Sequence, residues 1–442
     1  MIHSVFGAPS PISSTSPIET MYALVDCNSF FCSVERVFHA GLRHKPLVVL
    51  SSNDGCIVAL TPEAKAIGLH RGDPIFQVED IVKAHHVEVF SGNMYLYAAM
   101  SKRITSILRH SIHQVENYSI DESFCNLTGY GGHFDLVGMM RDIGRKIQLW
   151  TDIPVSIGIA PTKTLAKMGS KFAKQYRGYK GVCLIESTAQ RRKALSMFDL
   201  SDVWGIGRHT LECLNYHGIS TPLEFADKSE AWVKSHLHKP GVQTWLELNG
   251  IPVIDTSEVV RRKTICTSRS FGDMVSDLAS LKAAVASFSA SCANKLRADG
   301  SAGKTVSVFL YSNRFREDLP QYNNTASVSL LLPTSDTMEL TQAALRVLSA
   351  IYHPNILYKK AGVVISDIVS ATPMQTDLFD TIHNRQERNS LMNTTDRLNH
   401  RYGLKTIRLA VEGTERQAWM VKSDHRSPNY LTDITQLLTI RI

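Results

Sequence analysis

The chain has 442 residues, 43% of them hydrophobic, which is enough for two to four packed domains. Its formal net charge of +7 is modest for a nucleic-acid-binding protein, so the placement of the basic residues is more informative than their total. No apolar run is long enough to cross a membrane, and the Ser- and Pro-rich residues 1–20 have neither the basic nor the apolar part of a signal peptide. We therefore expect no membrane span, no signal peptide and a disordered extension over 1–20.

The eight cysteines are scattered along the chain, and no two of them form a Cys-x-x-Cys pair. This pattern favours reduced thiols over a disulfide framework or a zinc site. It predicts a cytoplasmic protein.

The first elements alternate between strand and helix. Residues 22–50 predict a strand, a helix over 30–38 and a second strand over 47–50, and a helical segment is expected within 51–93. Apolar residues at helical spacing predict a helix over 94–109. Residues 115–120 and 124–127 then predict a hairpin around the bend at 121–122.

Carboxylates stand at the ends or bends of these strands. Asp26 ends the first strand, and Asp121 and Glu122 form the bend of the hairpin. Three carboxylates that a fold brings together can hold two divalent cations for an in-line phosphoryl displacement, and Mg²⁺ needs few protein ligands beyond the substrate phosphates. The alternative is that Asp26 caps a turn and the acidic pair is a solvated hairpin tip, which spacing alone favours.

Four lysines follow at a spacing of four, four and three. Lys163, Lys167, Lys171 and Lys174 therefore share one face of a helix. For an isolated helix this would be a solvated basic face; near phosphates it would be a binding stripe. Further on, the glycines of 205–207 precede an apolar-patterned helix. Gly-x-Gly lets backbone N–H groups approach a phosphate closely, although alone it is more often an ordinary turn.

The remaining elements divide the second half of the chain. Residues 196–250 are helical and punctuated by glycines, and 251–262 reads as a linker. Strands that include 304–311, 326–332 and 361–369, with helices over 277–298 and 336–351, predict a βαββαβ module within 263–369. After about 372 the sequence becomes polar and irregular, which predicts a partly disordered tail.

Several motifs occur together in a characteristic order. They are Asp26-Cys27-Asn28-Ser29-Phe30-Phe31, Asn53-Asp54-Gly55-Cys56, Glu63-Ala64-Lys65-Ala66-Ile67-Gly68, Ser119-Ile120-Asp121-Glu122, Gly158-Ile159-Ala160-Pro161-Thr162-Lys163-Thr164-Leu165-Ala166-Lys167, Val203-Trp204-Gly205-Ile206-Gly207, Ser268-Arg269-Ser270-Phe271-Gly272 and Ser427-Pro428-Asn429-Tyr430. With them the chain, from Met21 to its C-terminus, resembles the Y-family translesion DNA polymerases, and most closely the UmuC-type catalytic subunits of DNA polymerase V.

The resemblance implies an α+β multidomain fold shaped as a right hand. It implies a palm over 21–195 with fingers inserted at about 51–93, a small helical thumb with a helix-hairpin-helix over 196–250, and a βαββαβ little finger over 263–369. A C-terminal tail, 370–442, would follow. One fold can host many unrelated functions, so the function depends on the site residues.

The resemblance also assigns the reaction centre. Asp26, Asp121 and Glu122 would be catalytic and, with the backbone carbonyl of Cys27, would hold two Mg²⁺ ions. Lys163 would reach the incoming triphosphate and Lys65 would be a second phosphate contact. Pro62 stands where many members have a tyrosine on the phosphate, so that contact is absent or replaced.

An aromatic pair follows Asp26. In the family, the aromatic at the position of Phe31 lies beneath the sugar and excludes a 2′-hydroxyl. The alternative is a core aromatic, because Phe30 and Phe31 are adjacent and at least one of them must be buried. We expect both residues at the substrate site and Phe31 as the gate.

The other implied contacts are with DNA and with a sliding clamp. The DNA contacts would be made by Lys167, Lys171, Lys174, Gly205, Gly207 and Arg208. Gln375, Leu378 and Phe379 match the short peptide that docks on the bacterial clamp. Short motifs of this kind often match by chance, but this one directly follows the predicted little finger.

These features predict an error-prone, template-directed DNA polymerase that acts on primer-template DNA and dNTP in the SOS response to DNA damage. The resemblance adds a UmuD-like subunit and RecA as partners. One alternative is a non-catalytic DNA- and clamp-binding subunit, which would predict a damaged carboxylate set. Another is a palm-fold nucleotidyl cyclase, which would need neither the thumb motif nor the clamp peptide.

Overall fold

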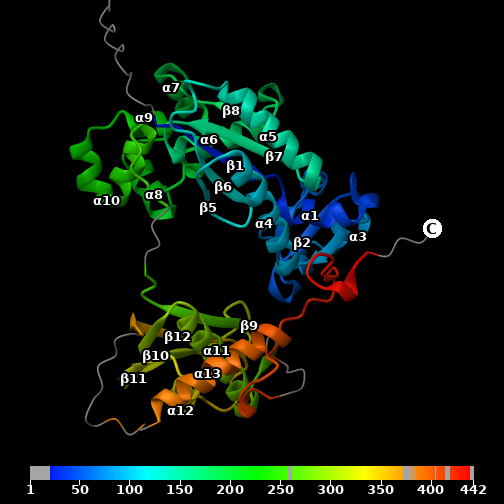
Figure 1. The fold of residues 1–442 in the computed structure, drawn as a ribbon, viewed down its shortest axis with the longest axis vertical. Coiled ribbons are helices and arrows are strands. Elements are labelled where there is room, and N and C mark those ends of the chain that lie inside the picture. Colours follow the sequence, from blue (N-terminus) through cyan, green and yellow to red (C-terminus); the bar gives the residue numbers. More distant parts are fainter. Residues whose placement is uncertain are drawn as a thin grey trace, which may run out of the picture.

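The computed structural model describes residues 20–256, 261–371, 380, 382, 384–403, 405–413 and 419–438. Its chain forms two lobes, with the elements up to α10 in one and β9 to α13 in the other (Figure 1). The C-terminal segment, red in Figure 1, runs from the second lobe back to the first. None of the helices in the described ranges is long and apolar enough to cross a membrane.

A five-stranded sheet lies at the centre of the first lobe. Its order is β5-β6-β1-β7-β8, with β1 antiparallel to both of its neighbours and β7 parallel to β8. The strands are β1 (Tyr22–Cys27), β5 (Val115–Asn117), β6 (Glu122–Asn126), β7 (Val155–Ala160) and β8 (Val182–Leu184). The predicted hairpin is therefore confirmed, and it pairs with the strand that carries Asp26.

Helices cover both faces of this sheet. Alternate residues of β1 enter different cores, because side chains of a strand point to opposite faces. Ala23 and Val25 pack on one face, and Leu24 packs on the other. The first face is covered by α1 (Phe30–Phe38), α4 (Met94–Ser111) and α5 (Leu136–Thr151), and the second by α6 (Lys163–Gln175).

A second sheet, β3-β2-β4, lies beside the first. It contains β2 (Leu47–Leu50), β3 (Ile57–Leu60) and β4 (Glu88–Ser91), with α2 (Pro62–Ala66) and α3 (Glu79–Ala84) between β3 and β4. The segment 51–93, in which a helical segment was expected, thus contains two short helices and, in addition, two strands. The run Leu-Val-Val-Leu of β2 is buried on both faces, so no alternation in the sequence indicates which sheet it joins.

A small helical region completes the first lobe. It consists of α7 (Thr188–Met197), α8 (Arg208–Tyr216), α9 (Pro222–Ala226) and α10 (Glu230–Leu248). Its attachment to α6 uses Glu247, which is fully buried and accepts hydrogen bonds from the backbone N–H groups of Thr164, Val253 and Ile254. One carboxylate thus joins α10, the start of α6 and the chain that leaves the lobe.

The second lobe confirms the βαββαβ order. Its sheet has the order β11-β10-β12-β9, and α11 and α12 pack on one face. The elements are β9 (Ile265–Val275), α11 (Leu278–Ala298), β10 (Ser301–Ser312), β11 (Asn323–Thr334), α12 (Thr337–Ile351) and β12 (Tyr358–Ser370).

A further helix, α13 (Arg385–Tyr402), lies where the sequence predicted an irregular tail. Only Met392 of this helix is fully buried, so it has almost no apolar periodicity to detect. Ion pairs attach it to the second lobe instead: Arg385 to Glu339 (3.0 Å), Arg388 to Asp336 (2.7 Å) and Asp396 to Arg297 (2.6 Å).

The close approach of α6 to β7 depends on a glycine. A Cβ atom at Gly158 would lie 2.0 Å from the carbonyl oxygen of Ala166 and 2.1 Å from the nitrogen of Ser170. Only a residue without a side chain lets the helix lie at this distance from the strand. Gly158 therefore sets the position of the lysines on α6 above the sheet.

We expect Gly158→Ala to destabilise the protein by about 3 kcal/mol or more, because backbone atoms would have to move. Gly178→Ala is the matched control, since a Cβ there meets nothing within 4 Å. Thermal unfolding of both variants measures the difference. Equal melting temperatures would contradict the assignment of Gly158 as the spacer.

Candidate active site

The three predicted carboxylates line one pocket at the centre of the first lobe. Asp26 is near the end of β1 and is the register partner of Glu122, which begins β6. Both residues, together with Asp121 and Cys27, line a pocket of about 530 Å³. The antiparallel pairing of β1 and β6 therefore brings together side chains that are far apart in sequence.

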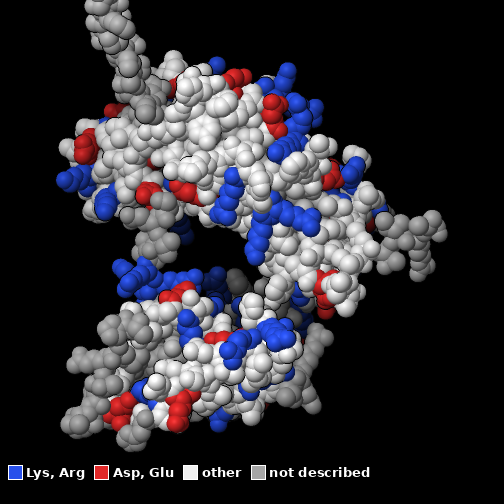
Figure 2. Space-filling view, viewed as in Figure 1, with Lys and Arg blue, Asp and Glu red and all other residues white. Residues whose placement is uncertain are grey.

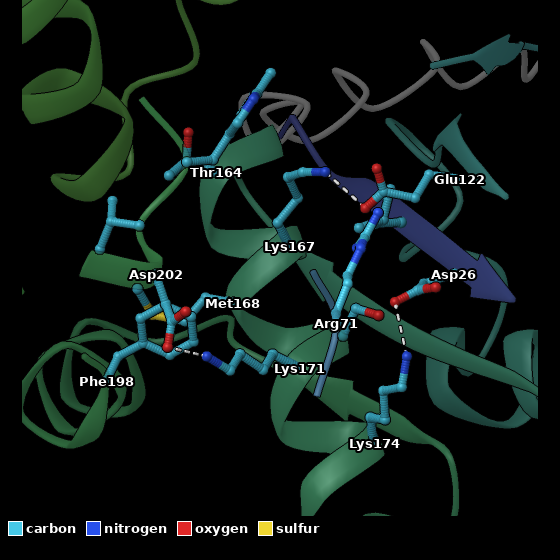
Figure 3. A pocket seen from close by; sticks show the side chains of 14 residues that line it. Asp26, Arg71, Glu122, Thr164, Lys167, Met168, Lys171, Lys174, Phe198 and Asp202 are labelled. Carbon is cyan, nitrogen blue, oxygen red and sulfur yellow. Dashed lines mark hydrogen bonds and ion pairs between the residues drawn. The ribbon is translucent and has the colours of Figure 1, made fainter. Parts of the chain in front are cut away.

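Each carboxylate has a different partner. Lys167 Nζ lies 2.6 Å from Glu122 Oε1, and Lys174 Nζ lies 3.6 Å from Asp26 Oδ2 (Figure 3). Asp121 Oδ1 accepts a hydrogen bond of 2.5 Å from the hydroxyl of Ser119. Two lysines of one helix thus act as counter-ions for two carboxylates of the sheet.

The pKa of Asp26 reflects this environment. Burial raises it to about 6, and the neighbouring Glu122 and Asp121 raise it as well, whereas Lys174 opposes the shift. Burial and the neighbouring carboxylates disfavour the ionised form of Asp26, and a nearby cation stabilises that form. The pocket is therefore electrostatically suited to positively charged groups.

The donor chemistry of the pocket fits a hard divalent cation. Carboxylate oxygens are the ligands that Mg²⁺ prefers, and Asp26, Asp121 and Glu122 supply them. In the described part of the chain, however, no three His, Cys, Asp or Glu side chains are disposed as a ready metal site. Lys167 and Lys174 occupy the carboxylates instead, so a cation would have to displace them.

The four lysines of α6 go to three different places. Lys167 and Lys174 face the carboxylates, and Lys171 forms an ion pair with Asp202 next to α8 (Figure 3). Lys163 is 2% exposed, and its Nζ lies 2.7 Å from both Glu116 Oε2 and Thr256 Oγ1. Lys163 lines a separate pocket near Tyr22, at the other end of β1, and is not brought together with Asp26.

An arginine that the sequence analysis did not single out faces the carboxylates. Arg71 follows α2 and lines the pocket with Asp26 and Glu122 (Figure 3). Lys65 is exposed on α2 and lines neither the pocket of about 530 Å³ nor the adjoining pocket that Asp26, Glu122 and α6 also line. Arg71 is exposed, and nothing in its spacing distinguishes it from any other surface residue; the turn after α2 places it beside the pocket.

The two aromatic residues after Asp26 differ in burial. Phe30 is buried in the core, whereas Phe31 is half-buried and lines the pocket. The ring of Phe31 stacks on that of Tyr97, with centroids 4.6 Å apart and planes inclined by 15°. Phe31 therefore presents one face of an anchored ring to the space beside the carboxylates.

The glycine-rich turn before α8 follows Val203 and Trp204, which line an adjoining pocket together with Asp26 and Glu122. Gly205 has a φ of +98°, and a Cβ there would lie 2.3 Å from Thr244 Oγ1, so the turn requires glycine. Gly207 is the N-cap of α8, and the Arg208 side chain that follows is exposed. The turn therefore places the start of α8 and the guanidinium of Arg208 at the surface of the helical region.

An aromatic contact joins this turn to the hairpin. Trp204 Nε1 donates a hydrogen bond of 3.1 Å to the hydroxyl of Tyr118, and Lys167 Nζ lies 4.6 Å from the centre of the Tyr118 ring. The pairing of Tyr118 with Trp204 has no signal in the sequence, because a contact between distant segments leaves no local pattern.

Basic side chains also gather away from the pocket. Figure 2 shows Lys and Arg on both sides of the hollow between the two lobes. The predicted clamp residues Gln375, Leu378 and Phe379 lie outside the described residues, as do residues 1–19.

Three family models match the chain. Residues 25–171 match the "impB/mucB/samB family" and 262–378 match its "C-terminal domain". Residues 389–440 match "Domain of unknown function (DUF4113)".

Known proteins align over most of the chain. Protein UmuC of Salmonella typhimurium is 37% identical and covers 95% of this chain and 100% of its own length. DNA polymerase IV 1 of Bacillus subtilis is 27% identical, covering 87% of this chain and 91% of its own. A solved "Y-family DNA polymerase chimera" of Dbh and Dpo4 has the same fold, with a TM-score of 0.62 and 21% identity over 79% of this chain and 99% of its own. The chain therefore belongs to the impB/mucB/samB family, as a UmuC-type member of the Y-family DNA polymerases.

Proposed function

We propose that the pocket lined by Asp26, Asp121 and Glu122 is where this polymerase adds nucleotides to a primer. As a UmuC-type member of the Y-family, the chain is a DNA-directed DNA polymerase of the translesion class. The observation that supports this site is that three carboxylates line one pocket with Lys174 and Arg71. The carboxylates are suited to binding metal ions, and the two basic side chains are suited to binding phosphate.

The domain arrangement that we propose follows the two lobes. The five-stranded sheet is the palm, the sheet β3-β2-β4 is the fingers, the helices α7 to α10 are the thumb, and the βαββαβ module is the little finger. The boundaries 21–195, about 51–93, 196–250 and 263–369 remain predictions from the sequence.

Y-family DNA polymerases are metal-dependent enzymes, and we propose two Mg²⁺ ions here. Asp26, Asp121, Glu122 and the carbonyl of Cys27 would hold them. When bound, the ions lower the pKa of the primer 3′-hydroxyl and neutralise charge on the triphosphate. The chain itself contributes a fixed set of oxygen ligands on two paired strands.

Lys174 and Arg71 are proposed to bind the triphosphate. Both line the pocket beside Asp26, and a lysine that no longer neutralises a carboxylate is free to bind a phosphate oxygen. Arg71 would add a planar, bidentate contact. Lys163 is already paired with Glu116, so its role is assigned to stability instead of nucleotide binding.

Phe31 is proposed to select deoxynucleotides. Its ring lines the pocket and is held by Tyr97, so that a 2′-hydroxyl would collide with a side chain that cannot easily retreat. Phe30, which is buried behind it, would support the same wall.

DNA contacts are proposed for the basic and glycine-rich surfaces near the pocket. These are Lys167 and Lys171 on α6, and Gly205, Gly207 and Arg208 at the start of α8. Contacts of this kind position the phosphate backbone without reading its sequence. Lys and Arg on both sides of the hollow between the lobes are suited to a duplex lying there (Figure 2).

The partners are proposed from the family relationship. They are a UmuD-like subunit, RecA and a sliding clamp, the last through Gln375, Leu378 and Phe379. We also propose that the protein acts in the cytoplasm. The alternative of a non-catalytic DNA-binding subunit is not favoured, because relatives named as DNA polymerases span most of the chain.

Asp121→Ala should abolish nucleotide addition. The loss of one of three ligands leaves cation charge uncompensated, so we expect activity to fall by about 10³-fold. The measurement is primer extension past an abasic site with Mg²⁺, dNTPs, clamp, and UmuD-like and RecA partners. Asp142→Ala, which removes an exposed carboxylate on α5, is the control. Unchanged extension by Asp121→Ala would place the reaction elsewhere.

Lys174→Ala should change the KM for dNTP, whereas Lys163→Ala should change the stability of the protein. Loss of Lys174 should raise the KM for dNTP about ten-fold with little change in melting temperature, as expected for one lost phosphate contact. Loss of Lys163 removes the cation beside the half-buried Glu116, which keeps only the hydroxyl of Thr256, and should cost about 2 kcal/mol of stability while the KM stays within about two-fold. The reverse pattern would return the nucleotide-binding role to Lys163.

Alanine at Gln375, Leu378 and Phe379 together should remove binding to the sliding clamp. Single-nucleotide addition without the clamp should be unchanged, because the described residues that line the pocket belong to other segments of the chain. Surface plasmon resonance on immobilised clamp and a clamp-free extension assay measure the two effects. Undiminished clamp binding by the triple variant would rule out this peptide.

A further inference from the structure

The segment that matches a domain of unknown function includes residues 419–438, a stretch of loops and turns with one short 3-10 helix, here called the strap. It starts in the second lobe, where Trp419 is buried against Phe288. It then crosses to the first lobe, and the backbone N–H of Lys422 donates to Asn53 Oδ1 at 3.0 Å (Figure 1). The strap thus connects the two lobes independently of the linker at 251–262.

The strap pairs with the end of β4. The N–H of Ser91 donates to the carbonyl of His425 at 3.0 Å, and the N–H of His425 donates to Ser91 Oγ at 2.9 Å. Two residues later, the buried Asn93 donates through Nδ2 to the carbonyl of Ser427 at 2.9 Å. Asn93 is also the N-cap of α4, so the strap fixes the start of that helix.

The Ser427 side chain reaches a second buried group. Its hydroxyl donates to Glu35 Oε1 at 3.0 Å, and the same oxygen accepts a hydrogen bond of 2.7 Å from the Tyr97 hydroxyl. Glu35 and Tyr97 are both fully buried, and Ser427 is nearly so. Tyr97 carries the ring on which Phe31 stacks.

We infer that the strap positions the gate ring, and that Ser427, acting through Glu35 and Tyr97, is a positioning residue for discrimination between deoxynucleotides and ribonucleotides. The inference rests on the proposed role of Phe31. It assigns a task to the C-terminal segment that its family description leaves open.

The burial of Glu35 makes these contacts sensitive to the loss of a single hydrogen-bond donor. Burial raises the pKa of Glu35, and its Oε2 has no hydrogen-bond partner among the described residues. A buried acid is costly unless it is hydrogen-bonded, so its two donors largely determine where it sits. If Ser427 no longer donates, Glu35 and the Tyr97 hydroxyl must rearrange together.

A second contact holds the other end of α1. The Tyr430 ring stacks on Phe38 at 4.8 Å, and its hydroxyl lies 3.3 Å from His39 Nε2. Phe31 is at the start of the same helix. The strap therefore holds α1 and α4, the two helices that carry the stacked rings of Phe31 and Tyr97.

The test is steady-state single-nucleotide incorporation by the full chain with its partners, comparing dNTP and the matching rNTP. In Ser427→Ala the ratio of kcat/KM for dNTP over rNTP should fall about five- to ten-fold, the scale of one lost hydrogen bond. The kcat/KM for dNTP should stay within about three-fold. A loss confined to overall activity would indicate a merely structural role and overturn the inference.

Three variants give matched comparisons. Ser423→Ala removes an exposed hydroxyl from the same strap and should leave the ratio unchanged. Ser427→Thr keeps the hydroxyl and should retain most of the discrimination. Tyr97→Phe removes the other donor to Glu35, and its effect combined with Ser427→Ala should be smaller than the sum of the two, because both act through one carboxylate.

The outcomes separate this inference from the proposed function. If wild-type protein incorporates no dNTP, the proposed function fails. If it does, but Phe31→Leu leaves the ratio unchanged, Phe31 is not the gate. If Phe31→Leu lowers the ratio and a folded Ser427→Ala, with a wild-type melting temperature, does not, then the strap does not position the ring.

Discussion

The packing of α6 against the central sheet is the constraint on which the site depends. Gly158 on β7 and Gly169 on α6 approach so closely that a Cβ on Gly169 would lie 3.1 Å from the Cα of Gly158. At this spacing, lysine side chains from the helix reach the carboxylates at the ends of β1 and β6. A helix held further out would leave those carboxylates without counter-ions in a half-buried pocket.

The same helix joins the carboxylate pocket to the helical region. Lys171 pairs with Asp202, and the start of α6 is fixed by the buried Glu247 of α10. The contact between Tyr118 and Trp204 adds a third connection, beside the hairpin that carries Asp121 and Glu122. Movement of the helical region is therefore mechanically connected to the position of Lys167, which lies over both aromatic rings.

The fold was largely predictable from the sequence because its strands and long helices carry clear apolar periodicity. The carboxylate set could be proposed because its residues stand at strand ends. The partners of the lysines were harder to predict. A shared helical face shows to which side of the helix the lysines point, but not which groups they contact, and Lys163 and Lys174 are about 16 Å apart along α6. That distance places one lysine at each end of β1, and only the tertiary structure tells which end holds the site.

Other parts of the site had no sequence signal. Arg71 enters the pocket through the course of a turn, and α13 is attached by ion pairs between segments instead of by an apolar stripe. The sequence of β2 does not indicate which of the two sheets the strand joins, because both of its faces are buried. In each case the deciding contact lies between residues that are distant in the chain.

The strap closes an unusually long loop, since Asn93 and Ser427 are 334 positions apart. Domains generally fold as units while the chain is being synthesised, starting from the N-terminus. The sheets and the helices that carry Phe31 and Tyr97 are thus translated well before Ser427 exists. Their hydrogen bonds to the strap can form only after Ser427 has been translated, so a nascent polypeptide that stalls before that point lacks the contacts of the strap with Asn93 and Glu35.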